Sequence, residues 1–242
     1  IEPLVTISHF ELPFQLGKRY DGFLDQRTIA FYERYATTLF ERYQDKVKYW
    51  LTFNEINFGT LEHGKQINGL FNREYTETEQ YQALHNVFLA SARAVIAGHK
   101  INPEFKIGCM LAYITMYPKT CRPEDVLRTQ QLNDRLNYFC GDVQVKGTYP
   151  YYMKRYFEKN DIQLEITEED QALLKEGTVD YYTFSYYMST CIAANLEDRE
   201  DTTGGNLFGG VANEYLKASD WGWQVDPVGL RYTLNQIYSR YE

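Results

Sequence analysis

The sequence predicts an α/β fold in which parallel strands alternate with helices. Four apolar runs, at residues 2–9, 47–54, 105–113 and 179–187, have the β-branched and aromatic content of buried strands. The segments between them carry apolar residues at three- and four-residue steps, as in residues 29–43, which is typical of helices that cover a sheet. In this fold class the functional site lies at the carboxyl ends of the strands. Polar residues that end these runs are therefore the first candidates for a site.

The second run ends in Asn54 and Glu55, which makes it the most informative of the four. Trp50 and Phe53 lie within the run and could shield the Glu55 carboxyl group from water. A carboxyl group at a strand end can donate a proton to a leaving group. An acidic residue that starts a helix after an Asn-rich turn has the same local pattern. From these residues alone both interpretations stay open.

Composition and charge disfavour several functional classes. The 242 residues are 44% hydrophobic and 24% charged, with a net charge of −8, which disfavours binding to nucleic acid or to an anionic membrane. No apolar run approaches the roughly 18 residues of a membrane span, and no signal peptide is visible. The cysteines lack zinc-ligand spacing, so we expect buried free thiols in a reducing cytoplasm, with a disulfide as the alternative. They are Cys109, Cys121, Cys140 and Cys191.

Capping residues mark several helix ends. Asp25 is expected to cap the helix that contains residues 29–43. Thr76 and Glu79 form a capping box before a second helix, and Gly98 is its expected end. His85 and His99 lie in or near this helix. Because they have no partner at metal-ligand spacing, we expect both to be packing or surface histidines.

The remaining segments have weaker local signals. Residues 58–75 are polar and contain glycine, and we expect a loop that faces the site. Residues 118–140 and 151–159 are expected to be helical. Asp226 followed by Pro227 predicts the start of a last helix.

Four blocks of the sequence follow the order of one known family. They are residues 5–13, 52–55, 180–189 and 220–230, and the second reads Thr52-Phe53-Asn54-Glu55. Together they resemble glycoside hydrolase family 1, whose Thr-x-Asn-Glu signature carries the general acid/base. The resemblance implies that Glu55 is the acid/base, that Asn54 holds the sugar 2-hydroxyl and that His9 contacts the sugar in the glycone subsite. It also implies that Tyr187 orients the nucleophilic carboxylate and that Trp223 binds the aglycone.

The family resemblance also implies a fold and a mechanism. The fold is a TIM (β/α)8 barrel, and the mechanism is a double displacement by two carboxyl groups about 5 Å apart, which needs no metal and no organic cofactor. Only about four of the eight β/α units are visible. We therefore expect residues 1–242 to be one domain, a partial barrel that lacks N-terminal and C-terminal units. The nucleophile is expected beyond residue 242, and the isolated chain is expected to be inactive.

Glu168 lies in a second candidate motif. Ile166-Thr167-Glu168 resembles the start of the family's nucleophile motif, but the Asn-Gly that should follow is absent. Thr167 and Asp170 have capping spacing, which predicts that a helix begins here. The family's nucleophile also follows the Trp-Gly-Trp block, whereas Glu168 precedes it. We therefore predict that Glu168 is not the nucleophile.

Two departures from the common family pattern indicate a subfamily. Ile56 follows Asn54-Glu55 where many members have proline, and Phe10 replaces a frequent tryptophan. Both features resemble bacterial phospho-β-glucosidases, which implies a cytoplasmic enzyme for small-molecule 6-phosphorylated β-glucosides. A plain β-glucosidase, a 6-phospho-β-galactosidase and a non-catalytic carbohydrate-binding fragment remain alternatives. The oligomeric state is left open between a monomer and a homo-oligomer.

The loop that precedes the last helix carries two tryptophans, Trp221 and Trp223. Residues 195–222 are rich in glycine and acidic residues, and Thr203-Gly204-Gly205-Asn206 predicts a turn. Both tryptophans are candidates for stacking on a sugar ring. For Trp221, packing in the core is an equally open interpretation.

Overall fold

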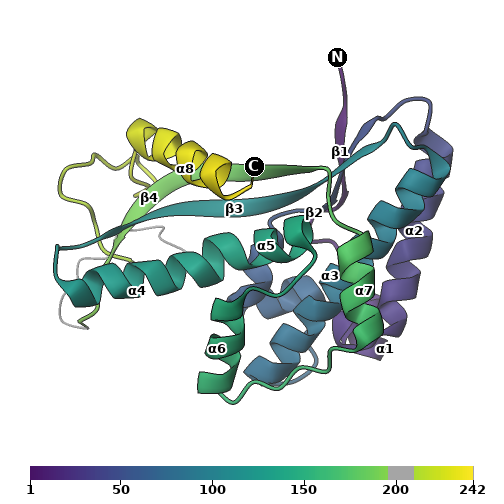
Figure 1. The fold of residues 1–242 in the computed structure, drawn as a ribbon, viewed down its shortest axis with the longest axis horizontal. Coiled ribbons are helices and arrows are strands. Elements are labelled where there is room, and N and C mark those ends of the chain that lie inside the picture. The colour runs from purple at the N-terminus through teal and green to yellow at the C-terminus, as the bar shows by residue number, and fades with distance from the viewer. Residues whose placement is uncertain (196–209, 242) are drawn as a thin grey trace. The chain divides into compact units, whose positions relative to one another are not determined.

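A computed structural model describes residues 1–195 and 210–241, and the predicted turn at 203–206 lies outside this part of the chain. The chain divides into two compact units. Unit 1 comprises Ile1–Leu111 and Tyr138–Phe184, and unit 2 comprises Ala112–Asn137 and Ser185–Glu242. Figure 1 shows the elements along the chain. Our expectation of a single domain stays a prediction.

The four predicted strands are confirmed and form one sheet in the order β1-β2-β3-β4. They are β1 (Leu4–Ser8), β2 (Tyr49–Phe53), β3 (Lys106–Pro118) and β4 (Tyr181–Ile192). β1 and β2 are parallel with Leu4 opposite Tyr49, and β2 and β3 are parallel with Leu51 opposite Gly108. The expected ends at residues 113 and 187 were too early. Both strands continue because β-branched and aromatic residues extend the apolar run.

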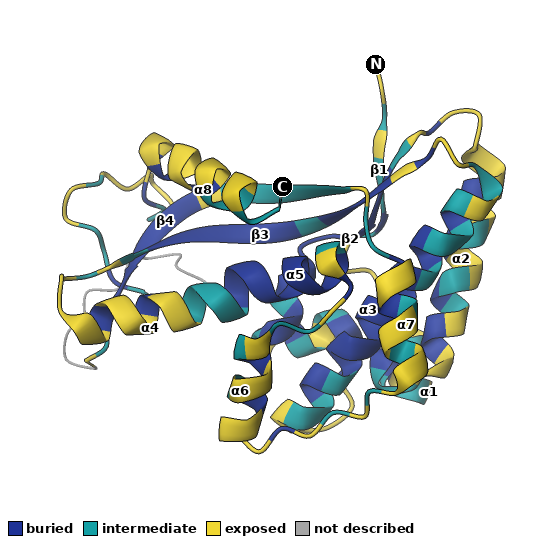
Figure 2. Cartoon of the chain, in the orientation of Figure 1, coloured by how far each residue is buried: buried dark blue, intermediate teal, exposed yellow. Residues whose placement is uncertain are grey.

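Helix α3 (Glu77–Ile101) is the central helix of unit 1. It packs against α2 (Arg27–Tyr43), α5 (Phe139–Lys146) and α7 (Glu168–Glu176). Figure 2 shows α3 buried over most of its length, whereas α2 and α7 alternate between buried and exposed faces. A helix that is enclosed by neighbours needs apolar residues on more than one side. The broad apolar surface of α3 meets this requirement. The shorter helices of this unit are α1 (Phe14–Tyr20) and α6 (Tyr151–Lys159), and the latter confirms the predicted helix.

The caps confirm most, but not all, of the predicted helix ends. The boxes of Thr76 with Glu79 and of Thr167 with Asp170 are both present. Asp25 accepts the backbone N–H of Arg27 at 2.9 Å, although the residue directly before α2 is Gln26. Gly98 was wrong as the end of α3, which continues to Ile101. A Cβ at Gly98 would meet Ile107 Cδ1 at 2.4 Å, so this glycine allows close packing against β3 instead.

Residues 58–75 are more ordered than the predicted loop. They contain most of the 3-10 helix η2 (Ile56–Thr60) and all of η3 (Glu62–Asn68); a third, η1 (Gly22–Leu24), precedes α2. The Gln80 side chain of α3 donates to the carbonyl oxygens of Gly59 at 2.8 Å and of Leu61 at 2.6 Å. Such long-range side-chain bonds leave no local sequence pattern, which explains why the segment looked irregular.

An aromatic core and several polar bonds position β2. The Trp50 ring is 1% exposed and meets the Phe40 ring edge-on, with centroids 5.0 Å apart. The Tyr181 hydroxyl donates to the Trp50 carbonyl oxygen at 2.8 Å. The Thr52 and Ser91 hydroxyl groups lie 2.9 Å apart. The strand that ends at the candidate acid is therefore fixed by both packing and hydrogen bonds.

Unit 2 contains α4 (Pro123–Asn133), most of the π-helical turn η4 (Asp134–Tyr138) and α8 (Pro227–Arg240). These elements and α5 confirm the predicted helical content of residues 118–140 and the last helix. Asp226 caps α8 by accepting the Gly229 N–H at 2.7 Å. Asp125 of α4 accepts the Ala194 N–H at 2.8 Å, which ties the residues after β4 to that helix.

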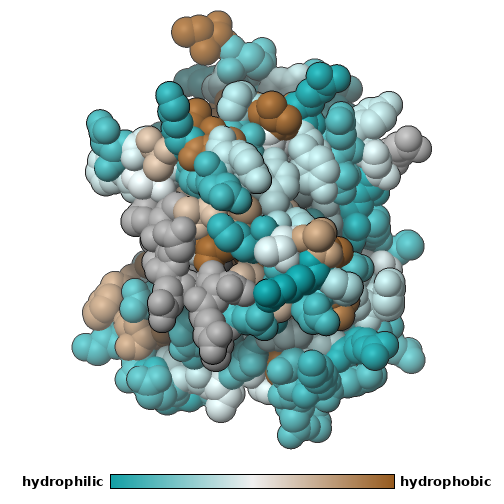
Figure 3. Space-filling model, turned by 90° about the vertical axis from the view of Figure 1, so that its left-hand side faces the viewer, coloured by the Kyte–Doolittle hydropathy of each residue, from teal (hydrophilic) through white to brown (hydrophobic). Residues whose placement is uncertain are grey.

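The cysteines are free thiols, and the surface drawn in Figure 3 is mostly hydrophilic. All four cysteines are free; Cys109, Cys140 and Cys191 are buried as expected, but Cys121 is exposed. Among the described residues no helix is both long and apolar enough for a membrane crossing. On the face drawn in Figure 3 most described residues are hydrophilic, and hydrophobic ones lie in separate groups.

Candidate active site

Asn54 and Glu55 lie at the carboxyl end of β2 and are buried. Their exposed fractions are 6% and 5%. The Asn54 N–H donates to the Ser8 carbonyl oxygen at 2.9 Å, which extends the pairing of β1 and β2 by one step. The apolar run that ends at residue 54 predicts this placement. At a buried position, electrostatic interactions between a side chain and a bound group are stronger than in water.

The backbone turns sharply at Glu55. Its φ of 42° and ψ of 48° are in the left-handed region, which costs a residue other than glycine about 1–2 kcal/mol. Strained residues of this kind cluster at functional sites. Glu55 is also the residue before η2, so the interpretation as a helix-start acid is partly correct. Its side chain nevertheless makes no capping hydrogen bond to η2, so capping does not explain the carboxyl group.

His9 follows β1 and is exposed. Its backbone N–H donates to Glu11 Oε2 at 2.8 Å. Because β1 and β2 are parallel neighbours, their carboxyl ends share one edge of the sheet, where His9 and Glu55 both lie. Three of the predicted site residues, His9, Asn54 and Glu55, are thus on the same edge within unit 1.

An aromatic row runs beside these residues. The Phe10 ring meets the Phe58 ring edge-on with centroids 5.8 Å apart, and His9 and His63 continue the row on either side. Phe10 has a φ of 73°, so both strands are followed by a left-handed residue that is not glycine. In the sequence, Phe10 stands out only as a departure from the family pattern. Its backbone conformation has no sequence signal, because phenylalanine rarely adopts it.

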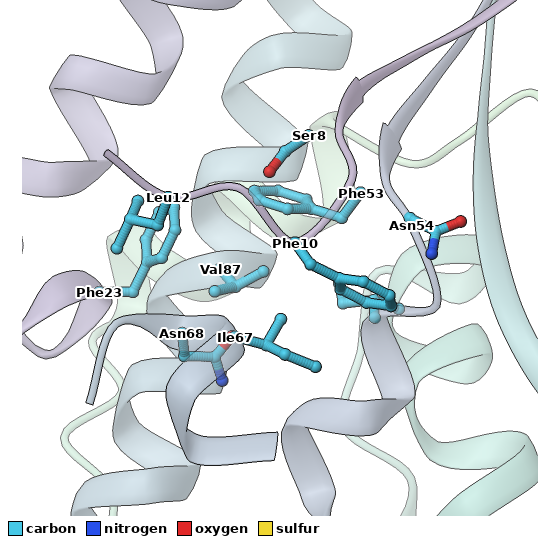
Figure 4. Close-up of a pocket in the computed structure, with 10 residues that line it drawn as sticks. Ser8, Phe10, Leu12, Phe23, Phe53, Asn54, Ile67, Asn68 and Val87 are labelled. Atoms are coloured by element: carbon cyan, nitrogen blue, oxygen red, sulfur yellow. The ribbon is translucent and has the colours of Figure 1, made fainter. Parts of the chain in front are cut away.

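A small pocket opens beside Asn54 in unit 1 (Figure 4). Its wall is mainly apolar, and Phe10, Phe53 and Ile67 form much of it. The complete lining is Ser8, Phe10, Leu12, Phe23, Phe53, Asn54, Ile56, Ile67, Asn68 and Val87. Ile67 and Asn68 belong to η3, so residues 58–75 do reach the candidate site. Asn54 therefore lies against a mainly apolar wall.

Tyr187 and Trp223 lie in unit 2 and contact each other. Their ring centroids are 5.4 Å apart. Tyr187 was expected at the end of its strand but lies within β4, and its exposed fraction is 51%. Trp221 is 81% exposed, which excludes core packing of this residue in the described part of the chain. Unit 2 therefore presents aromatic side chains that are accessible to a ligand.

Asp226 holds the segment that follows Trp223. Its Oδ2 accepts from the Ser189 hydroxyl at 2.7 Å and from the Tyr117 hydroxyl at 2.9 Å, and its carbonyl oxygen accepts from the Tyr186 hydroxyl at 2.6 Å. Burial and the Asp226 charge raise the pKa of Tyr186 to about 12, so its hydroxyl stays protonated and can donate. Tyr186 and Ser189 flank Tyr187 in β4. From the sequence, Asp226 is predicted only as a helix cap.

Glu168 and the histidines do not form a further site with these residues. Glu168 is exposed at the first position of α7. His85 is 1% exposed, with Nδ1 3.0 Å from the Tyr149 hydroxyl oxygen and Nε2 3.6 Å from Asp170 Oδ2. Burial lowers the pKa of His85, and the nearby Asp170 carboxylate opposes this shift. His99 pairs with Asp180 at 2.9 Å. Both histidines therefore have structural partners.

The fold and the strand-end carboxyl group define an α/β protein of the TIM-barrel class, with a parallel sheet that places polar residues at its carboxyl edge. The family model of glycosyl hydrolase family 1 matches residues 1–242, and the chain belongs to this family. This confirms the resemblance that the four sequence blocks indicated.

Relatives and solved structures agree with this assignment. The chain is 54% identical to the aryl-phospho-β-D-glucosidase BglH of Bacillus subtilis and 49% identical to the 6-phospho-β-glucosidase of Clostridium longisporum, with all of this chain and 51% of each relative covered. A family 1 β-glucosidase from Thermotoga maritima has a similar structure, with a TM-score of 0.79, 22% identity and coverage of 100% of this chain and 52% of that one. The chain therefore spans about half the length of these proteins.

Proposed function

We propose that the whole protein that contains these residues is a retaining glycosidase that hydrolyses 6-phospho-β-glucosides. The observation that carries this proposal is the buried Glu55 at the carboxyl end of β2, directly after Asn54 and on the same sheet edge as His9. In the first step, the Glu55 carboxyl group donates its proton to the glycosidic oxygen as the bond to the aglycone breaks. In the second step, the Glu55 carboxylate accepts a proton from the water that releases the sugar.

The second carboxyl group is the nucleophile, which attacks the anomeric carbon and forms a covalent glycosyl-enzyme. We propose that it follows a later strand, beyond residue 242. Asn54 and His9 bind sugar hydroxyl groups, Tyr187 donates to the nucleophilic carboxylate and Trp223 contacts the aglycone. These roles follow from the family's motif, residue by residue.

The preference for a 6-phosphate group is supported by the names of the relatives. Six relatives that are 42–54% identical are named for phosphorylated glucosides or cellobiose. A 6-phospho-β-galactosidase of Staphylococcus epidermidis is 32% identical. Assays with 4-nitrophenyl β-glucoside and β-galactoside, each with and without a 6-phosphate, separate these activities. We expect kcat/KM to be highest for the phosphorylated glucoside, and a higher value for either plain sugar would overturn the phosphate preference.

The test of the acid role uses Glu55→Gln in the complete enzyme. Cleavage of alkyl glycosides, whose leaving groups need protonation, should fall about 10²–10⁴-fold, whereas bond cleavage in aryl glycosides with acidic phenols should change little. Glu168→Gln is the matched control, and its activity should equal that of the unmodified enzyme. Equal losses on both substrate types in Glu55→Gln would show that Glu55 is not the acid.

We also propose that residues 1–242 by themselves do not turn over a β-glucoside. An activated 2-deoxy-2-fluoro glycoside traps the glycosyl-enzyme, and intact-protein mass spectrometry detects it. We expect an adduct on the complete enzyme and none on residues 1–242. A stoichiometric adduct on the shorter chain would make Glu168 a nucleophile candidate again.

A further inference from the structure

The backbone N–H of Glu55 forms a hydrogen bond with a side chain of the neighbouring strand β3. At Asn54 the hydrogen bonding of β2 is still that of a sheet, since its N–H donates to Ser8 of β1. One residue later the Glu55 N–H donates to the thioether sulfur of Met110 at 3.3 Å. Leu51 lies opposite Gly108 in the register of β2 and β3, so Met110 is two residues further along β3. Met110 is thus level with Phe53, the last residue of β2, and close enough to reach Glu55 two residues later.

The backbone carbonyl group of Glu55 also forms a hydrogen bond. The Phe58 N–H donates to the Glu55 carbonyl oxygen at 2.9 Å. The Phe58 ring, in turn, meets the Phe10 ring. The two backbone polar groups of Glu55 thus have separate partners, Met110 for the N–H and η2 for the carbonyl oxygen. Together they fix the left-handed conformation that sets the direction in which the side chain leaves the backbone.

We propose that Met110 is a positioning residue for the acid/base, acting through the Glu55 backbone N–H; this rests on the acid role of Glu55. Methionine suits this position because its sulfur is a weak acceptor on an otherwise apolar, unbranched side chain. It can therefore satisfy a buried N–H without adding a second charge or a strongly polar group beside the carboxyl group. Leucine has nearly the same volume but no acceptor.

The difference between methionine and leucine gives a selective test. In Met110→Leu, the Glu55 N–H loses the sulfur while the packing volume is retained. We expect kcat/KM for alkyl glycosides to fall about tenfold, because a small displacement of a catalytic group has a large effect on rate. Bond cleavage in activated aryl glycosides should stay within about twofold, since it needs little proton donation.

Two further variants show whether the lost hydrogen bond is the cause. Met153→Leu makes the same substitution at a core residue of α6 that is 1% exposed, and both substrates should react as with the unmodified enzyme. Met110→Gln restores an acceptor on an unbranched side chain of similar length. Its ratio of alkyl to aryl kcat/KM should lie closer to that of the unmodified enzyme than the ratio of Met110→Leu does. Thermal melting shows that each variant is folded.

Two outcomes would overturn the positioning role. The first is an unchanged alkyl to aryl ratio in Met110→Leu, whether both rates are retained or fall equally. The second is a Met110→Gln ratio as low as that of Met110→Leu. The Glu55→Gln result separates this failure from that of the proposed function. If Glu55→Gln loses alkyl cleavage selectively while Met110→Leu does not, Glu55 is the acid and Met110 does not position it. If Glu55→Gln shows no selective loss, both proposals fail.

Discussion

The candidate residues at the carboxyl end of β2 and the aromatic pair of unit 2, Tyr187 and Trp223, differ in how far they are buried and in what fixes their positions. Asn54 and Glu55 are buried, and their backbones are held by hydrogen bonds from the Asn54 N–H to Ser8 and from the Glu55 N–H to Met110. Tyr187 is half exposed and contacts Trp223, while the side chain of Asp226 bonds to the segments around them. Proton transfer requires a defined position, whereas aromatic contact with an aglycone tolerates variation. The proposed roles therefore place different demands on the two regions, and variants in each region can test them.

The largest effect should come from the buried edge of unit 1. In the complete enzyme Asn54→Ala should lower kcat about 100-fold, because hydrogen bonds to sugar hydroxyl groups strengthen as the transition state forms. His9→Ala should lower kcat less, about tenfold, because His9 is exposed and water competes for its hydrogen bond to the sugar. Steady-state kinetics measure both. A rise in KM with unchanged kcat would mean uniform binding and would remove the distinction between the two regions.

Loss of the hydrogen bonds of Asp226 in unit 2 should mainly lower the stability of the fold. Asp226→Ala leaves the Ser189 and Tyr117 hydroxyl groups without their carboxylate acceptor and removes the cap of α8. We expect the free energy of unfolding to fall by about 2–4 kcal/mol, measured by urea titration. Asp220→Ala changes an exposed residue of the same unit and should stay within about 0.5 kcal/mol. Equal losses in the two variants would contradict a specific role of the network.

The aromatic pair should have a smaller effect on catalysis. In Trp223→Leu, kcat/KM for aryl glycosides should fall about 2–10-fold, the range expected for one lost aromatic contact. Tyr215→Leu alters a residue of unit 2 that is 86% exposed and should leave kcat/KM unchanged. A loss of 100-fold or more in Trp223→Leu would place this residue among the groups that act in the chemical step.

The smallest expected effect is a pH dependence of stability in unit 1. Burial lowers the pKa of His85, which faces the Tyr149 hydroxyl and the Asp170 carboxylate. As the pH falls through about 6.5, the unfolded state therefore takes up the proton first and gains stability relative to the folded state. The urea midpoint should be highest above this pH and decline below it. His85→Gln should reduce the decline, and His63→Gln, at an exposed residue, should not. An identical decline in both variants would exclude His85 as the cause.

Local patterns predicted much of the fold. The four strands, the capping boxes at Thr76 and Thr167 and the cap at Asp226 each depend on a few adjacent residues, which the sequence displays directly. The positions of Asn54 and Glu55 were predictable for the same reason, because strand end and motif coincide. The proposed roles of His9, Tyr187 and Trp223 come from the family resemblance, because no local pattern indicates them.

What the sequence did not predict depends on contacts between distant segments. The Gln80 side chain bonds to Gly59 of η2 and to Leu61, which precedes η3. Gly98 lies within α3 and allows close packing against β3. The Met110 sulfur reaches Glu55 across neighbouring strands that are separated by 55 positions in the chain. Such partners can be found only once the strands are placed side by side.

The central claim, that Glu55 is the acid/base of a double displacement, is tested most directly by azide rescue of Glu55→Gln in the complete enzyme. Without a base to activate water, the glycosyl-enzyme formed from an activated 6-phospho-β-glucoside should accumulate, and azide needs no base to attack it. We predict that azide restores turnover and that the product is the β-glycosyl azide, identified by NMR. Turnover that azide does not change, or an α-glycosyl azide as the product, would contradict the assignment.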